Sequence, residues 1–317
     1  MQSFRKRAMT AILNQPHFQD ADKAREYLEA QVWPNGRICP HCGSIGEHYT
    51  LKGKTNRPGL YKCAECREPF TVTVGTVFER SKVGLHIWLQ AVHLMSASKK
   101  GVSAKQLERM LGVTYKTAWF MAHRLREAMN MPAEGKLGED GGPVEVDETY
   151  WGNVGKHKPG ARGGDHKMKL VSLVDRKGEK RTVHVPDVTA KTVRGVMKKH
   201  ISEHAALMTD EAAIYKKIGT EFASHNSVNH SRDEYVDMIR PWVTTNTVES
   251  SFALLKRGLM GTFHSVSEQH LQRYAHEFDF RWNYRIGTGY DDVQRAQMLL
   301  QNIVGKRLTY RRIDALS

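Results

Sequence analysis

Apolar residues recur at helical spacing in several stretches of the N-terminal half of the chain. Between residues 85 and 95 they follow the i, i+3, i+4, i+7 pattern of an amphipathic helix, and a weaker match lies at residues 20–31. Residues 102–129 contain two apolar stripes separated by Gly112, which predicts two helices joined by a turn. The segment 33–80 instead shows turns and short strands, and its β-branched run 71–78 predicts a strand pair.

The C-terminal half changes pattern after a Gly-, Pro- and charge-rich stretch at 130–143, where we expect a linker and the main domain boundary. Strand, two strands joined at 176–180, helix, short strand and helix then follow, a mixed α/β order, and the chain is mainly helical from Thr245 onward. We expect six segments: an N-terminal helical segment (1–32), a small β unit (33–80), a helical region (81–130), a linker (131–143), an α/β domain (144–290) and a basic tail (291–317).

Composition narrows the class of partner. The 317 residues include 48 Lys and Arg against 34 Asp and Glu, a formal charge of +14, which favours nucleic acid first and an anionic membrane second. Neither a run of about 18 apolar residues nor a signal peptide is visible. We therefore expect a cytoplasmic, nucleoid-associated protein with no membrane partner.

The four cysteines form two matched pairs, Cys39 with Cys42 and Cys63 with Cys66, each with two residues between its members and twenty residues between the pairs. This spacing suits a tetrahedral thiolate site for structural Zn²⁺ in a reduced compartment, with His41 as a bystander. This small β unit, a zinc ribbon, either only stabilises the fold or also contacts DNA, and the sequence leaves both possibilities open. Two matched pairs argue against a redox role.

The helical pair at 102–129 has the form of a helix-turn-helix. Ala118, Met121, Leu125 and Met129 would face inward. DNA would then meet exposed basic side chains of the second helix, which are Lys116, His123, Arg124 and Arg126. An ordinary helical hairpin with a solvated basic face explains the same spacing.

Three acids occupy positions that suit a divalent metal site. Asp147 lies in the first strand of the α/β region, Asp210 ends the short strand ALMTD, and Glu249 lies on a helix that also carries Asn246 and Lys256 along one stripe. Lys256 would meet DNA phosphates. Each acid taken alone also fits a solvated surface charge.

The chain resembles the zinc-ribbon insertion-sequence transposases of the DDE class, close to the insertion-sequence 1595 family. The resemblance spans nearly the whole chain. It rests on CPHC and CAEC, LGVTYKTAWFMAHRLR, VEVDETYWG, TDEAAIY and NTVESSFALLKRGLMGTFHSVSEQHLQRYAHEFDFRWN. It implies a multidomain α+β protein in which a zinc ribbon and a helix-turn-helix region precede a ribonuclease-H-like catalytic domain with a mixed sheet.

The resemblance also implies site residues. Asp147, Asp210 and Glu249 would bind catalytic Mg²⁺ or Mn²⁺, and Asn246 is the alternative third ligand because some members place Asn there. Lys256 would contact the transposon end, with Arg257 beside it, and His230 is a weaker candidate near the site. Only the resemblance selects Asp147 over Glu148, which strand alternation places on the other face.

The implied activity is metal-dependent cleavage at the terminal inverted repeats followed by strand transfer into target DNA. The protein would act as a homodimer or larger synaptic complex on double-stranded DNA. Charge alone suggests that the loop 155–167, with Lys156, Lys158 and Arg162, and the basic run 306–312 grip flanking or target DNA. Two other functions stay open: a catalytically silent DNA-binding regulator, and a nuclease that cuts without strand transfer.

Overall fold

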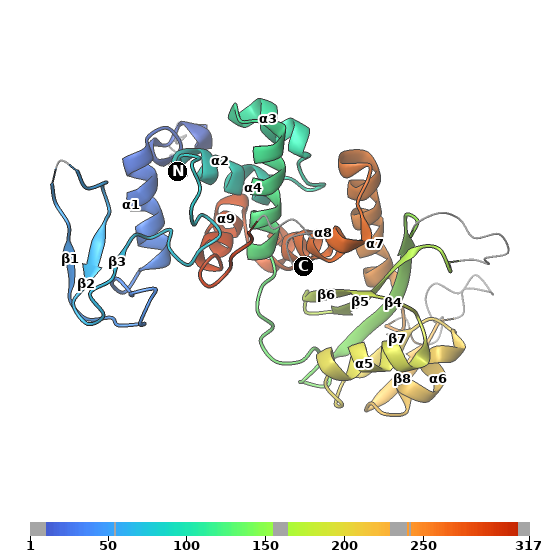
Figure 1. Ribbon diagram of the computed structural model, residues 1–317. Coiled ribbons are helices and arrows are strands. Elements are labelled where there is room, and N and C mark those ends of the chain that lie inside the picture. Colours follow the sequence, from blue (N-terminus) through green and yellow to red (C-terminus); the bar gives the residue numbers. More distant parts are fainter. Residues whose placement is uncertain (1–10, 54, 155–163, 229–239, 241, 310–317) are drawn as a thin grey trace, which may run out of the picture. The chain divides into compact units, whose positions relative to one another are not determined.

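The computed structural model describes residues 11–53, 55–154, 164–228, 240 and 242–309. The chain divides into two compact units (Figure 1). The first comprises Met1–Ala97, Ala104–Ala128 and Asp292–Ser317, and the second comprises Ser98–Ser103 and Met129–Asp291. Among the described residues, no helix combines the length and apolar character needed to cross a membrane.

The first unit is largely helical and is assembled around α2 (Leu85–Ala97), whose Trp88 and Met95 are fully buried. Its other helices are α1 (Ala21–Val32), α3 (Ala104–Leu111), α4 (Tyr115–Ala128) and α9 (Asp292–Gln301). These elements confirm the helices predicted near residues 20–31, 85–95 and 102–129. Two short 3₁₀ turns, Ile12–Asn14 and Pro16–Phe18, precede α1.

The segment 291–317 is not simply a basic tail, and that expectation was wrong for its first part. Helix α9 packs against α2, burying Leu299 and Leu300, and Arg295 donates a hydrogen bond to the Ser96 carbonyl at 2.8 Å. The apolar residues of α9 recur at helical spacing, so its packing follows from the ordinary burial of a helix face.

The ribbon is a three-stranded antiparallel sheet in the order β1 (His48–Thr50), β2 (Tyr61–Cys63) and β3 (Pro69–Phe70). The strand pair expected at 71–78 is absent, and the described backbone there forms turns. Val72, Val77 and Phe78 are buried in the core, while the backbone turns at Gly75 with φ +72° and makes one isolated bridge, from Thr76 to Val304. Most β-branched residues of this stretch are buried without forming paired strands.

The second unit contains a five-stranded mixed sheet in the order β6-β5-β4-β7-β8. β5 pairs antiparallel with β4 and β6, whereas β7 pairs parallel with β4 and β8, as expected for a ribonuclease-H-like domain. The strands are β4 (Pro143–Trp151), β5 (Met168–Asp175), β6 (Lys180–Val185), β7 (Ala206–Thr209) and β8 (Ser224–Ser227).

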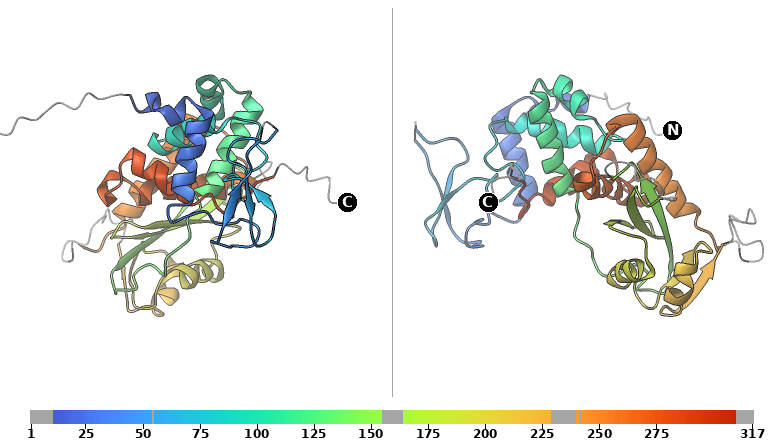
Figure 2. Two further views of the ribbon diagram at one scale, coloured as in Figure 1. Left: turned by 90° about the vertical axis from the view of Figure 1, so that its left-hand side faces the viewer. Right: turned by 45° about the vertical axis from the view of Figure 1, so that its right-hand side comes forward.

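Helices cover both faces of this sheet (Figure 2). One face carries α5 (Ala190–His200) and α6 (Ala213–Gly219), and the other carries α7 (Asn246–Gly258) and α8 (Glu268–Asn283). A π-helical turn, Leu259–Phe263, continues α7, and a 3₁₀ turn, Ile286–Thr288, follows α8. The multidomain α+β class with a mixed sheet is thus confirmed.

Strand alternation divides the core into two layers. Val144 and Val146 of β4 pack with Val193 and Met197 of α5, whereas Leu170 of β5 packs in the layer of α7 and α8. The odd-numbered residues of β4 therefore face α7, which decides where its acidic side chains point.

The stretch expected to be a linker, 131–143, lies wholly within the second unit. Leu137 is buried in the α5 layer, and its amide donates to the His200 carbonyl at 2.8 Å. The Gly138 amide donates to Asp175 at 3.1 Å. The Gly- and Pro-rich composition of this stretch predicted a linker, but its apolar Leu137 packs into the core of the second unit.

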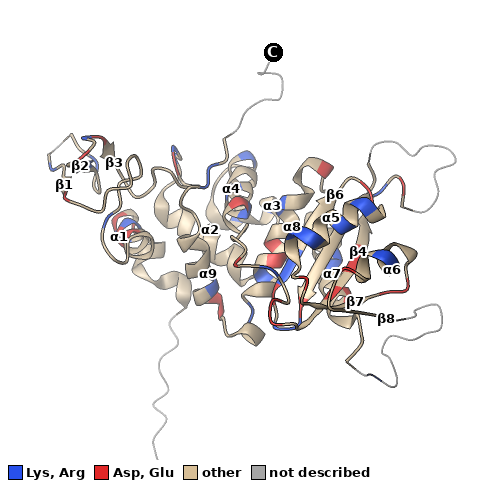
Figure 3. Ribbon diagram, turned by 90° about the horizontal axis from the view of Figure 1, so that it is seen from below, with Lys and Arg blue, Asp and Glu red and all other residues tan. Residues whose placement is uncertain are grey.

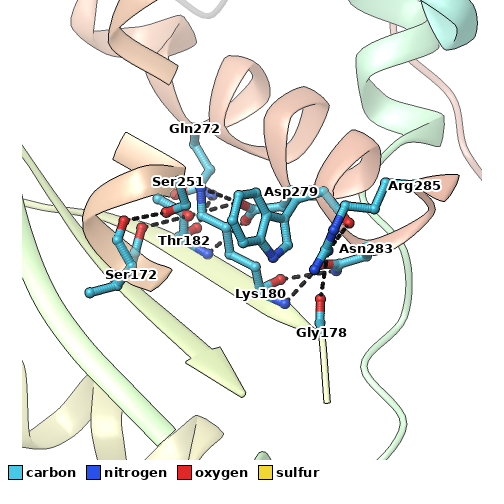
Figure 4. Close-up of polar contacts among 11 residues, drawn as sticks. Ser172, Gly178, Lys180, Thr182, Ser251, Gln272, Asp279, Asn283 and Arg285 are labelled. Atoms are coloured by element: carbon cyan, nitrogen blue, oxygen red, sulfur yellow. Dashed lines mark hydrogen bonds and ion pairs between the residues drawn. The ribbon is translucent and has the colours of Figure 1, made fainter. Parts of the chain in front are cut away.

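Side chains of α8 cover the outer edge of β6 (Figure 4). Asn283 accepts from the Lys180 amide at 2.7 Å and donates to the Lys180 carbonyl at 3.0 Å. Asp279 accepts from the Thr182 amide at 2.6 Å, and Gln272 accepts from the His184 amide at 2.6 Å. These bonds satisfy edge groups that could otherwise pair with another strand.

Candidate functional site

The second unit brings three predicted acids to one region. Asp147 lies on β4 facing the α7 layer, Asp210 directly follows the neighbouring parallel strand β7, and Glu249 lies in the first turn of α7. All three are half-buried. Acidic positions on β4 and α7 are red in Figure 3.

Each acid has a local hydrogen bond that fixes one of its oxygens. Asp147 accepts from the Glu148 amide at 2.7 Å, Asp210 from the Ala212 amide at 3.0 Å, and Glu249 from the Thr245 hydroxyl at 2.8 Å. A carboxylate has further lone pairs, so these bonds orient the groups without using all of their acceptor capacity.

Electrostatics link the acids to one another. The pKa of Asp147 rises from 3.8 to about 7, first because of burial and then because of the negative charges of Glu148, Asp210 and Glu249. Placing carboxylates close together in a partly buried site costs electrostatic free energy. Their oxygens suit Mg²⁺ or Mn²⁺, which prefer oxygen ligands. The residues present therefore fit a divalent cation.

Glu148 is turned toward α6, as strand alternation predicts. Its carboxylate accepts from the Tyr215 hydroxyl at 2.5 Å, and burial raises its pKa. Burial also raises the pKa of Tyr215, with the charge of Glu148 adding to it. The structure thus gives Glu148 a protein partner on the opposite side of the strand from Asp147.

The remaining polar candidates on α7 are exposed. Asn246 begins the helix one turn before Glu249, and Lys256 and Arg257 lie in its last turn. Arg257 donates to the Ala253 carbonyl at 3.0 Å. Lys156, Lys158, Arg162 and His230 lie outside the described residues.

One acid near the site, Glu145, was not predicted from the sequence. Glu145 is fully buried on β4, on the same face as Asp147, and accepts hydrogen bonds from Thr247 and Val248 of α7. The signal was an acid two residues before Asp147, which strand alternation places on the same face.

The four cysteines converge as predicted. Their sulfurs all lie within 4.8 Å of one another, and among the described residues no other group of three or more metal-binding side chains is this close. The hydrogen bond from the Cys66 backbone lowers the pKa of the Cys63 thiol to about 7, whereas the pKa values of the neighbouring Cys42 and Cys66 thiols are raised. Buried Tyr61 and Phe70 pack around the site.

His41 stands apart from the cysteine cluster, as expected of a bystander. Its Nε2 lies 3.4 Å from the Pro69 carbonyl. The arrangement of four close thiols on short strands and turns is that of a Zn²⁺ site.

The helix pair α3–α4 has the predicted turn, with Gly112 at φ +65° and Thr114 accepting from the Thr117 amide at 3.3 Å before α4 begins. Ala118, Met121 and Leu125 are buried, as predicted.

The predicted basic surface of α4 is only partly present. Lys116 is exposed, but His123, Arg124 and Arg126 are buried, so the expectation that they are exposed was wrong. Arg124 donates to the carbonyls of Val77 at 2.9 Å and Glu79 at 3.0 Å. Its guanidinium satisfies buried backbone groups, so it serves the packing of the first unit rather than an open DNA surface.

Comparison with known proteins covers both units. A family model described as an ISXO2-like transposase domain matches residues 140–283, and one described as a transposase zinc-ribbon domain matches residues 19–68. The chain is also similar to an uncharacterized protein in transposable element ISH50 of Halobacterium salinarum, with 29% identity over 271 residues, 80% of this chain and 88% of that protein.

Solved structures show more distant likeness. The Drosophila P element transposase strand transfer complex matches with a TM-score of 0.28 and 11% identity, over 70% of this chain and 65% of that one. A pre-cleavage Mos1 transpososome matches with a TM-score of 0.22 and 16% identity, over 61% and 75%. The two family models, which share one family and together span more than half of the chain, carry the assignment. The chain therefore belongs to the insertion-sequence 1595 family of transposases.

Proposed function

We propose that this transposase cuts the ends of its insertion sequence and transfers them into target DNA, with Asp147, Asp210 and Glu249 as the metal ligands. The observation that carries the proposal is the position of Asp147 on β4, where burial first and then the charges of Glu148, Asp210 and Glu249 raise its pKa to about 7. A structural core has no need to collect acidic side chains at this cost.

In this proposal the three carboxylates hold Mg²⁺ or Mn²⁺, which when bound activates a water and stabilises the leaving oxygen of the phosphodiester. Water would add to phosphorus and the bond to the 3′ oxygen would break, which leaves a 5′ phosphate on the flanking strand and a free 3′ hydroxyl on the element. That hydroxyl would attack a target phosphodiester, whose own P–O3′ bond would break and release a target 3′ hydroxyl. Asp147 must lose its proton to serve as a ligand, so its raised pKa makes metal binding compete with protonation.

Glu249 is preferred over Asn246 as the third ligand. Glu249 contributes to the raised pKa of Asp147, whereas Asn246 brings no charge and is exposed at the first residue of α7. An amide carbonyl binds a divalent cation without neutralising it, so a carboxylate suits this position better.

DNA would be held by exposed basic residues outside the acid cluster. Lys256 and Arg257 lie on the same helix as Glu249, and Lys116 lies on α4. The roles of Lys156, Lys158 and Arg162 are proposed from charge alone. Joining two ends in one reaction calls for a homodimer or larger synaptic complex.

A labelled duplex that carries the sequence flanking the gene tests the activity. With Mg²⁺ or Mn²⁺, the parent protein should release a product with a 3′ hydroxyl at the element's end and then join it to a target duplex. Binding without cleavage would instead establish a DNA-binding regulator. Cleavage without joined products would establish a nuclease.

A further inference from the structure

Glu145 connects the strand that carries Asp147 to the helix that carries Glu249. Its side chain is 0% exposed. One carboxylate oxygen accepts from the backbone amides of Thr247 at 2.8 Å and Val248 at 2.9 Å. The other accepts from the Thr247 hydroxyl at 2.8 Å and from Arg176 Nε at 3.1 Å.

The Thr244 hydroxyl accepts from the Asn246 amide at 3.1 Å, and Glu145 supplies the acceptor for the next two amides of helix α7. Thr245, at the N-cap position, donates its hydroxyl to Glu249 instead of accepting from a helix amide. The first amides of a helix need acceptors, and a negative charge is favourable at the positive end of the helix dipole. Glu145 therefore caps α7 from the neighbouring strand.

Through these hydrogen bonds Glu145 links the backbone near two proposed metal ligands. Asp147 lies two residues from Glu145 on the same face of β4, and Glu249 directly follows Val248 on α7. Arg176 extends the contact, because its second nitrogen donates to the Thr244 carbonyl at 3.3 Å just before the helix. Movement of α7 along the strand would have to break these bonds.

We propose that Glu145 is a positioning residue that sets the separation of Asp147 and Glu249 and thereby tunes the metal affinity of the site. This role rests on the proposed metal ligands. Groups that orient metal ligands commonly change metal affinity by about 10- to 100-fold when they are replaced. A cap that only stabilised α7 would change the stability of the protein and leave that affinity alone.

Binding of Mn²⁺, followed by the EPR signal of the free ion in the full chain without DNA, separates the two roles. Glu145→Gln, which loses the negative charge and the ion pair with Arg176, should weaken Mn²⁺ binding by about 10-fold or more. Amide exchange at Thr247 and Val248 should rise in parallel. Thr247→Val, which removes one donor and leaves both amides, should give a smaller change in the same direction.

Asn283→Ala provides the matched control, because it removes two hydrogen bonds between α8 and β6, an edge strand separated from β4 by β5. It should lower the melting temperature without changing Mn²⁺ affinity. Unchanged affinity in both Glu145→Gln and Thr247→Val, with affinity lost in Asp147→Ala, would overturn the positioning role and leave the proposed ligands standing. Affinity retained in Asp147→Ala would overturn the proposed site and this role with it.

Discussion

In the ribbon, four sulfurs lie within 4.8 Å of one another, whereas the acids of the second unit lie on β4, directly after β7 and on α7, and the charges of Asp210 and Glu249 act on Asp147. The ribbon has a small apolar core that includes two of its own cysteines, Cys39 and Cys63. The second unit instead has two large apolar layers, one on each face of its sheet, that hold the sheet and its helices together.

This difference indicates what each metal would do. Because the ribbon is small and has little apolar core, bound Zn²⁺ would contribute much of its folding free energy. The second unit is built around a large core and would fold without metal, which leaves its acids available for a reacting ion.

Replacing a thiol should unfold the ribbon and spare the second unit. Structural zinc sites are worth about 10–16 kcal/mol at neutral pH in small domains, so Cys63→Ser should abolish zinc binding and expose the amides of β1–β3 to exchange. Zinc content and hydrogen exchange measure this. His41→Ala should keep its zinc, and a protected β2 in Cys63→Ser would show that the ribbon folds without metal.

The second unit should instead depend on its buried polar contacts. Lys180 and Asp279 are both buried, with Nζ 3.3 Å from Oδ1, and burial lowers the pKa of Lys180 (Figure 4). Asp279→Ala leaves the lysine without this carboxylate and should cost about 3–5 kcal/mol in urea denaturation. Adding Lys180→Met should recover much of the loss. If Asp279→Ala is as stable as the parent, the ion pair contributes nothing to the free energy of unfolding.

The acid cluster should cost stability when no divalent metal is present. The folded pKa of Asp147 is about 7 and its ordinary value is 3.8, so the unfolded chain loses this proton first and stability falls as pH rises between these values. Asp147→Asn removes that loss and should raise the melting temperature by about 2–4 °C above pH 7. The gain should vanish near pH 4. A gain that is equal at both pH values would contradict the raised pKa.

The smallest expected effect concerns DNA contact by α7. Lys256 is exposed in the last turn of that helix, so Lys256→Ala should leave folding unchanged and reduce the slope of log binding affinity against log salt by about one. Fluorescence anisotropy with the element's end measures this slope. Lys23→Ala, an exposed lysine on α1, is the control, and an equal slope for both variants would remove Lys256 from the DNA surface.

Local patterns predicted much of the fold. Helical spacing located α2 and the α3–α4 pair, the order of strands and helices after residue 143 predicted an α/β domain, and the resemblance implied its mixed sheet. The cysteine spacing predicted the ribbon site, because two knuckles bring their own ligands together.

What the sequence did not predict depends on partners far along the chain. The burial of Arg124 depends on carbonyls 45 and 47 residues away in sequence, and the role of Glu145 depends on a helix more than 100 residues later. Composition also misled at residues 71–78, because side chains that favour strands were used to fill a core between turns.

Cleavage of a labelled element end in Mg²⁺ or Mn²⁺, compared among single variants, tests whether the three acids are the catalytic metal ligands. Asp147→Ala, Asp210→Ala and Glu249→Ala should each bind the DNA and fail to cut it, while Asn246→Ala should cut at near the parent rate. Cleavage retained in any of the first three, or lost in Asn246→Ala alone, would contradict the assignment of Asp147, Asp210 and Glu249 as the catalytic metal ligands.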